Sequence, residues 1–187
     1  PGSNVYDLGC STGTTLLMLD RALPADVNLI GVDDSREMLV KCESKLREHQ
    51  VKRKVELQCT DLHLGVDMKD ASLALMVLTL QFLRPLHRER LIADVFKGLR
   101  ENGGLILVEK VLGEDSHFNR LFIKHYYDFK RRNGYSETEI AQKREALENV
   151  LIPYKLLENR ELLLKSGFRY VDVFFKWYNF CGIVAIK

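Results

Sequence analysis

The stretch Val5–Gly13, with the sequence VYDLGCSTG, decides the fold of this chain. Its apolar start predicts a short buried strand, and its small residues predict a tight loop that leads into a helix. Small residues let a ligand approach the backbone closely, and a helix N-terminus offers free N–H groups. The stretch therefore indicates a ligand-binding strand–loop–helix unit.

Two acidic markers follow this loop at informative distances. Asp33, with Asp34 beside it, ends a second apolar run and lies 24 residues beyond Gly9, and Asp61 follows a third run. A carboxylate after the second strand can accept hydrogen bonds from both ribose hydroxyls. One after the third can accept from an adenine amino group. No second glycine loop is present for another nucleotide, so we infer S-adenosylmethionine rather than NAD as the ligand.

Each acidic residue also has a plainer interpretation. Asp34 or Ser35 could cap the helix that begins near Arg36, and Asp61 could be a turn residue. We expect Asp33 to hold the ribose while a neighbour caps the helix. Leu62 is expected to pack on the adenine ring, and Gly9, Cys10 and Ser11 to hold the ligand through the loop.

Length and composition fit one domain over residues 1–187, with 46% apolar residues and a formal net charge of +2. Because the net charge is nearly balanced, direct binding of nucleic acid is not predicted. Basic clusters at 52–54 and 130–132 are either solvated faces or contacts for an anion or RNA. The chain starts almost directly on a strand, so we expect that an N-terminal segment is missing.

The four cysteines form no CxxC pair and have no His at ligand spacing. We therefore expect reduced thiols, a cytoplasmic protein and no metal site. No apolar run approaches the roughly 20 residues of a membrane helix, so no membrane partner is predicted.

Apolar runs and helical periodicity alternate along the first 110 residues. Strands are expected at Asn4–Leu8, Asn28–Val32, Lys54–Cys59, Ser72–Leu78 and Gly104–Glu109. Helices are expected at Thr14–Ala22, Arg36–His49 and His87–Arg100, with a turn over 100–104. The alternation predicts βαβ units with right-handed crossovers and a parallel sheet.

The pattern changes after residue 110. Helices are expected at Ser116–Arg132 and Glu137–Val150, the second with a Ser136–Glu139 capping box, and a third near Leu156–Ser166. Two strands, about Arg169–Lys176 and Phe180–Ile186, flank a turn at 177–179. We predict an α/β, Rossmann-like class I methyltransferase fold with seven mostly parallel strands and a C-terminal antiparallel hairpin. A helical insert, about 115–150, is expected to cover the ligand-binding edge.

The pattern G-x-S-x-G at residues 9–13 also matches the nucleophile elbow of α/β-hydrolases. That elbow needs an oxyanion loop upstream and a late Asp and His, which this chain lacks. The end of the fourth strand, residues 78–82, lacks the N-P-P-[YF] motif of many amino-group methyltransferases. Arg144 could clamp a ligand carboxylate bidentately or could be a surface residue; spacing alone favours the surface.

More specific motifs lie in the insert and near the C-terminus. They include DFKR at 128–131, NGYSE at 133–137, QKR at 142–144, LENV at 147–150 and SGF at 166–168. With DLGCS at 7–11 and TLQFL at 79–83, they resemble the carboxy-S-adenosyl-L-methionine synthases of bacterial tRNA modification. The resemblance extends over essentially the whole chain.

This resemblance implies carboxylation of the S-adenosylmethionine methyl group, with prephenate as carboxyl donor and phenylpyruvate released. It implies a homodimer whose product, carboxy-S-adenosylmethionine, passes to a tRNA carboxymethyltransferase that forms 5-oxyacetyluridine at the wobble position. Arg144 would hold the new carboxylate. Gly9, Cys10, Ser11, Asp33, Asp34, Asp61 and Leu62 would hold the rest of the ligand.

Two departures from the family accompany this resemblance. An N-terminal tyrosine that reaches the ligand is absent, and Val77 stands near the end of the fourth strand where an asparagine is usual. Two alternatives therefore stay open: a conventional methyltransferase acting on a small molecule or RNA, and an inactive protein that binds an S-adenosylmethionine derivative.

Overall fold

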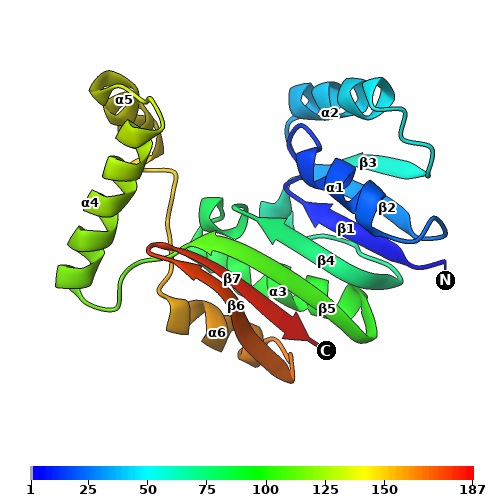
Figure 1. Ribbon diagram of the computed structural model, residues 1–187. Coiled ribbons are helices and arrows are strands. Elements are labelled where there is room, and N and C mark those ends of the chain that lie inside the picture. The colour runs from blue at the N-terminus through cyan, green and yellow to red at the C-terminus, as the bar shows by residue number, and fades with distance from the viewer. Residues whose placement is uncertain (1) are drawn as a thin grey trace.

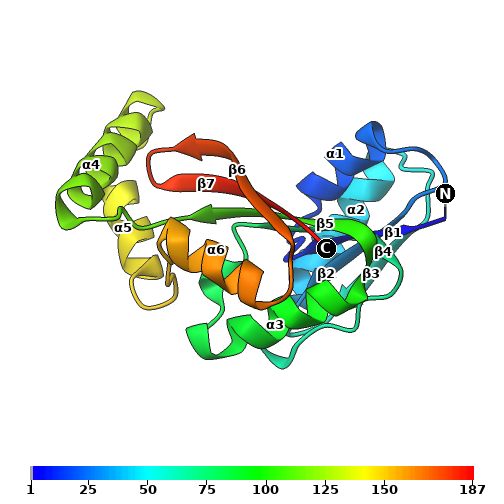
Figure 2. The same cartoon turned by 90° about the horizontal axis from the view of Figure 1, so that it is seen from below.

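The computed structural model describes residues 2–187, which form one seven-stranded sheet between two layers of helices (Figures 1 and 2). The strand order is β3-β2-β1-β4-β5-β7-β6. β7 is antiparallel to both of its neighbours, and all other pairs are parallel. The predicted methyltransferase fold, with its C-terminal hairpin, is therefore confirmed.

The strands are β1 Asn4–Leu8, β2 Asn28–Asp33, β3 Val55–Cys59, β4 Ala71–Val77, β5 Leu99–Lys110, β6 Tyr170–Trp177 and β7 Phe180–Ile186. The α-helices are α1 Thr14–Ala22, α2 Arg36–Glu48, α3 Pro85–Gly98, α4 Ser116–Arg132, α5 Glu137–Leu147 and α6 Leu156–Lys165. Two short 3₁₀ helices are η1 Leu62–Leu64 and η2 Leu80–Phe82.

Each face of the sheet has its own core. α3 and α6 cover one face, where Leu91, Ile92 and Leu163 pack against the strands. α1 and α2 cover the other face through Leu16 and Leu39, but only over the half of the sheet that contains β1 to β3 (Figure 1). Burial of these aliphatic helix faces removes apolar surface from water, which is the main driving force for folding.

Helix starts follow the capping signals of the sequence. Ser35 caps α2, because its hydroxyl accepts a hydrogen bond from Met38 N–H at 3.3 Å. Ser136 and Glu139 form the expected capping box at the start of α5, with bonds of 2.8 Å and 3.2 Å. Ser35, not Asp34, is therefore the cap of α2.

The first residues of β5 differ from the sequence-based expectation of a turn over 100–104. α3 ends at Gly98, and Leu99 already pairs with Ala71, so residues 100–104 are not a free turn. The next pair is Leu73 with Gly104, and Asn102 adopts a left-handed φ of 60°. The residues between Leu99 and Gly104 form a bulge in β5, because β5 pairs with β4 both before and after them.

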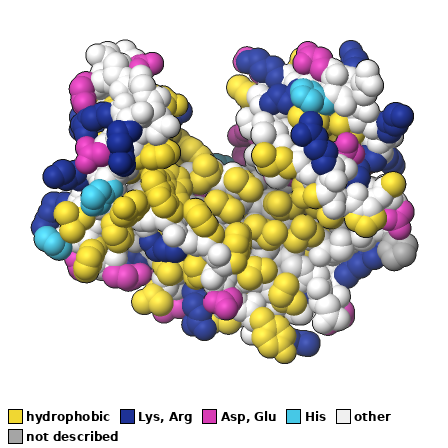
Figure 3. Space-filling model, viewed as in Figure 1, with side chains coloured by type: hydrophobic (Ala, Val, Ile, Leu, Met, Phe, Trp, Pro, Cys, Tyr) yellow, Lys and Arg dark blue, Asp and Glu magenta, His cyan; other side chains and the backbone are white. Residues whose placement is uncertain are grey.

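The insert stands beside the carboxyl edge of the sheet. No side chain of α4 is fully buried, and Figure 1 shows α4 and α5 set apart from α2. Figure 3 shows the hollow between these two lobes, with hydrophobic side chains along its floor. The insert therefore bounds the edge on one side but leaves it open. α5 ends at Leu147, three residues before the predicted end.

Asp7 is a buried acid in β1, directly before the loop. Its side chain is 1% exposed, and Oδ2 has no hydrogen-bond partner in the described part of the chain. Burial, and secondarily the nearby charge of Asp33, raises the pKa of Asp7 to about 7. Asp7 is therefore protonated in the folded protein at mildly acidic pH, whereas it is ionised in the unfolded chain.

This pKa shift predicts a pH-dependent stability. The folded pKa lies above the unfolded value of 3.8, so the stabilisation is complete below about pH 4 and is lost as the pH rises through 7. We expect Asp7→Asn to remove about 2–3 kcal/mol of the fall in unfolding free energy between pH 5 and pH 8. Urea denaturation at several pH values measures this. The exposed Asp67→Asn is the control, and identical slopes for wild type and Asp7→Asn would contradict the prediction.

Candidate functional site

A cavity of about 390 Å³ lies over the carboxyl ends of β1, β2, β3 and β4. Its volume is within the range of small-molecule sites, about 300–1,000 Å³. Seven of the nine predicted site residues line it: Gly9, Ser11, Asp33, Asp34, Asp61, Leu62 and Val77. We call it the loop cavity. Segments from Gly9 to Leu83 meet here, because parallel strands end at the same edge.

The loop after β1 packs closely against the end of β4. Gly9 has a φ of 84°, and a Cβ there would lie 2.3 Å from Oγ1 of Thr79. Only glycine fits this position, since any side chain would collide with Thr79 and strain the backbone. Ser11 also adopts a left-handed φ, of 47°. The loop is thus held in one conformation, with its backbone exposed to the cavity.

Asp33 fastens this loop to the next helix. Its Oδ2 accepts a hydrogen bond from Ser11 N–H at 2.9 Å, and its Oδ1 accepts one from Ser35 N–H at 3.0 Å. Both carboxylate oxygens of Asp33 therefore already accept a hydrogen bond from the backbone, although each has a second lone pair that could accept from a ligand hydroxyl.

Asp34 is the carboxylate that the fold leaves free. It is exposed, lines the loop cavity and makes no side-chain hydrogen bond or ion pair within the described residues. Asp61, in contrast, caps η1, because its Oδ1 accepts from His63 N–H at 2.8 Å. That bond holds the pKa of Asp61 below its usual range. Asp61 therefore has a structural role, as a helix cap where the sequence analysis had offered a turn residue, and its other oxygen is left for a ligand.

Cys10 is the loop residue whose side chain does not reach the cavity. It is 5% exposed and packs in the core beneath α1 and α2. A hydrogen bond with the Cys42 thiol, together with burial, raises the pKa of Cys10, so it stays a neutral thiol. Only its backbone could contact a ligand. All four cysteines are free thiols.

The sequence analysis missed Leu78 and Thr79, which line the loop cavity beside Val77. Leu78 has a φ of 58°, an unusual conformation for a branched aliphatic residue. It is fixed by a 2.7 Å bond from its N–H to the Val108 carbonyl. No sequence signal marks this conformation. Thr79 could have been found as the small polar residue that faces Gly9.

Arg144 lies apart from the other predicted residues, in a second cavity of about 250 Å³. This insert cavity is bounded by α4, α5, the end of β5 and the β6–β7 turn. The two cavities share no lining residue. The two cavities also differ in charge. The loop cavity is lined by three aspartates and by no Lys or Arg. The insert cavity is lined by one acid, Glu148, and by four basic residues: Lys110, Lys130, Lys143 and Arg144.

A buried polar network joins the rims of the two cavities. Glu109 accepts hydrogen bonds from Leu80 N–H at 3.1 Å and from Gln81 N–H at 2.8 Å. Gln81 Oε1 in turn accepts from Lys110 N–H at 2.8 Å. Burial raises the pKa of Glu109 to about 8, although the backbone N–H groups oppose this. The network fixes η2, beside the loop cavity, to the start of the insert cavity.

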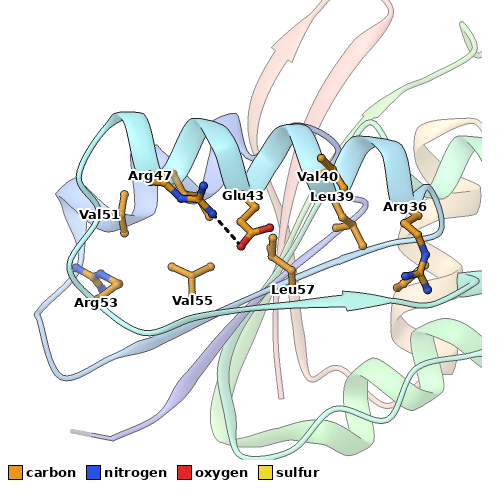
Figure 4. Close-up of a pocket in the computed structure, with 11 residues that line it drawn as sticks. Arg36, Leu39, Val40, Glu43, Arg47, Val51, Arg53, Val55 and Leu57 are labelled. Carbon is orange, nitrogen blue, oxygen red and sulfur yellow. Dashed lines mark hydrogen bonds and ion pairs between the residues drawn. The ribbon is translucent and has the colours of Figure 1, made fainter.

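A larger and more open groove of about 620 Å³ lies elsewhere, between α2 and the edge strand β3 (Figure 4). Aliphatic side chains such as Val55 and Leu57 line it, with a 3.3 Å ion pair between Glu43 and Arg47. It contains none of the predicted site residues and follows the outer edge of the sheet along β3. We therefore place the site in the loop and insert cavities.

Among residues 2–187, no helix has the length and apolar character needed to cross a membrane. Within the same range, no three His, Cys, Asp or Glu side chains gather as a metal site would require.

Comparison with solved structures supports the fold alone. A possible exported protein from Bordetella parapertussis has a TM-score of 0.73 and 16% identity over 100% of this chain and 62% of that one. An S-adenosylmethionine-dependent methyltransferase from Aquifex aeolicus has a TM-score of 0.67 and 17% identity over 99% of this chain and 82% of that one.

Comparison of sequences is more specific. A family model described as a methyltransferase domain matches residues 5–103. A carboxy-S-adenosyl-L-methionine synthase of Methylococcus capsulatus is 65% identical over 188 residues, which cover 100% of this chain and 78% of the relative. One from Helicobacter pylori is 43% identical over 100% of this chain and 75% of the relative. The chain therefore belongs to the carboxy-S-adenosyl-L-methionine synthase family of enzymes, built on a methyltransferase fold.

Proposed function

We propose that this protein converts S-adenosylmethionine to carboxy-S-adenosylmethionine, with prephenate as the carboxyl donor. The 65% identity to the Methylococcus capsulatus synthase over the whole chain carries the proposal. The structure adds support, because one cavity is acidic and the neighbouring one is cationic. An acidic cavity suits the cationic sulfonium substrate, and a cationic cavity suits an anionic donor.

The substrate fits the loop cavity through distinct contacts. The backbone of Gly9 and Ser11 would face the methionine part of the ligand, while the free Asp34 carboxylate would accept from the ribose hydroxyls. Asp33 would assist Asp34 and hold the loop in place. Asp61 and Leu62 would hold the adenine, and Val77 would bound the cavity near the reacting methyl group.

The reaction needs positive charge and proximity rather than a nucleophile. The substrate methyl group loses a proton, and the donor loses carbon dioxide and hydroxide. The proton and hydroxide form water, and a new carbon–carbon bond joins the methyl carbon to carbon dioxide. Arg144 would hold the new carboxylate by bidentate hydrogen bonds, and fixed cations stabilise such charge without reorganisation.

The remaining parts of the proposal concern partners. We infer a cytoplasmic homodimer whose product passes to a tRNA carboxymethyltransferase for 5-oxyacetyluridine formation. The homodimer and this downstream step rest on the resemblance of the insert motifs.

The function is tested by the small molecule released when the purified protein is denatured, and by incubation with S-adenosylmethionine and prephenate. We expect a nucleoside heavier than S-adenosylmethionine by the mass of one carbon dioxide, formed together with phenylpyruvate. Mass spectrometry identifies both products. Formation of S-adenosylhomocysteine with an added acceptor would instead favour a conventional methyltransferase, and binding without turnover would favour an inactive binding protein.

The two neighbouring aspartates should give different phenotypes. We expect Asp34→Asn to raise the KM for S-adenosylmethionine about tenfold to a hundredfold with unchanged thermal stability, because it removes a charged acceptor that the fold does not use. Asp33→Asn should lower the melting temperature, because the amide nitrogen that replaces one carboxylate oxygen cannot accept, so the bond from either Ser11 N–H or Ser35 N–H is lost. Steady-state kinetics and thermal denaturation measure this, with Glu37→Gln on the exposed face of α2 as control. A normal KM for Asp34→Asn would assign the ribose to Asp33 alone.

Arg144→Met tests the carboxylate clamp. We expect kcat/KM for carboxylation to fall about 30-fold to 1,000-fold, the usual cost of removing one partner of a close charge pair. Binding of S-adenosylmethionine should not change, because Arg144 does not line the loop cavity. Arg132→Met, on α4 but outside both cavities, is the control. A loss of S-adenosylmethionine affinity equal to the loss of activity would contradict this division of roles.

A further inference from the structure

Gln81 is a buried residue that lies between the two cavities and lines neither of them. It is the middle residue of η2 and is 5% exposed. Its neighbours along the chain, Thr79 and Phe82, both line the loop cavity. Burial of an amide side chain is costly unless its polar atoms are hydrogen-bonded, so the partners of Gln81 indicate what it does.

Three polar atoms of Gln81 reach three different partners. Its N–H donates to Glu109 Oε2 at 2.8 Å, and its side-chain Oε1 accepts from Lys110 N–H at 2.8 Å. Its carbonyl accepts from Ile152 N–H at 2.8 Å. These three bonds fix the position of η2 relative to β5 and to the segment that returns from α5.

Two of these partners belong to the wall of the insert cavity. Lys110 lines that cavity, and Ile152 lies between two further lining residues, Leu151 and Pro153. Both contacts come from backbone N–H groups, so Gln81 holds the main chain of the wall rather than side chains that can rotate. A shift of η2 when the loop cavity is filled would therefore also move the wall of the insert cavity.

We propose that Gln81 is a positioning residue that couples ligand binding in the loop cavity to the shape of the insert cavity. A ligand in the loop cavity contacts Thr79 and Phe82, and Gln81 passes the resulting position of η2 to Lys110 and Ile152. The coupling rests on the proposed function, which supplies S-adenosylmethionine as the loop-cavity ligand and prephenate as the second substrate. It would limit loss of the donor's carboxyl group when no acceptor is bound.

The chain has one tryptophan, Trp177, and its place makes it a reporter of this coupling. Lys110 pairs with Phe180 across β5 and β7, and Phe180 pairs with Trp177 across β7 and β6. The Trp177 ring centroid lies 4.9 Å from that of Phe129 in α4. Trp177 lines neither cavity, so a change in its emission reports movement of the insert rather than contact with the ligand.

Gln81→Met tests the coupling, because methionine has a similar length but does not replace the amide oxygen that accepts from Lys110 N–H. Calorimetry on the whole chain measures S-adenosylmethionine affinity, and fluorescence measures the accompanying change in Trp177 emission. We expect Gln81→Met to bind S-adenosylmethionine within about threefold of the wild type, to lose most of the emission change, and to lower kcat/KM for prephenate about tenfold.

Tyr6→Phe is the matched control for Gln81→Met. It also removes a buried side-chain oxygen that accepts from a backbone N–H, that of Lys69 at 3.0 Å, but Tyr6 lines neither cavity. A general loss of stability would affect both variants alike. We expect Tyr6→Phe to retain the S-adenosylmethionine affinity, the emission change and the kcat/KM for prephenate.

Hydrogen exchange in the wild type tests the same coupling if Gln81→Met does not fold. We expect S-adenosylmethionine to slow exchange of the Lys110 and Ile152 amides at least about fivefold more than exchange of the Lys69 amide. Equal slowing at all three amides would reflect the global stabilisation that any bound ligand produces, and it would contradict the coupling.

The remaining outcomes separate the coupling from the proposed function. A full emission change and normal kcat/KM in Gln81→Met, or an equal loss in Tyr6→Phe, would refute the coupling while carboxylated product from the wild type left the function standing. An emission change that depends on Gln81, without carboxylated product, would support the coupling and refute the function. No emission change in the wild type would overturn the coupling, and no binding of S-adenosylmethionine would overturn both.

Discussion

The carboxylate of Asp33 is the constraint on which the loop cavity depends. One oxygen accepts from the loop at Ser11 and the other from the first turn of α2 at Ser35. The end of β2 thereby fixes both the loop after β1 and the direction of α2. Asp34, one residue later, is left without a protein partner and faces the cavity. The fold thus uses one of two adjacent carboxylates and leaves the other without a partner, a difference that a sequence motif cannot reveal.

A second constraint connects the insert to the sheet. Arg88 is 1% exposed and donates to the carbonyls of Leu83 at 2.8 Å and Ile152 at 2.5 Å, while its guanidinium lies 4.2 Å from the Tyr154 ring centroid. Ile152 N–H donates to the Gln81 carbonyl at 2.8 Å. The segment that returns from α5 is therefore held against η2, so α5 is anchored to the sheet although α4 has no fully buried side chain. Burial of a charge without a carboxylate partner is tolerated because carbonyl oxygens surround it.

The sequence predicted the elements that local patterns control. Apolar runs located every strand of the sheet, and Ser35 and Ser136 were readable as helix caps. It predicted the loop cavity because strand ends converge in any parallel sheet. It could not predict that Asp33 is occupied or that Leu78 is left-handed, since tertiary pairing with Ser11 and Val108 decides both. The bulge at Asn102 was missed for a similar reason: glycines and a polar residue resemble a turn unless the partner strand is known.

The separation of charge between the two cavities bears on how a carboxyl group could be transferred without a nucleophile. S-adenosylmethionine carries a sulfonium, which three aspartates in the loop cavity attract, whereas four cations attract an anion to the insert cavity. In the proposed reaction each substrate would thus be directed to a different cavity, and exchange of their positions would be opposed by like charges. The two reacting groups would meet at the boundary, near the ends of β4 and β5. Glu109, in β5 beside this boundary, is buried, and its pKa of about 8 reduces its negative charge at neutral pH. A largely neutral acid opposes the field of the cations less, which would favour formation of a carboxylate at this place.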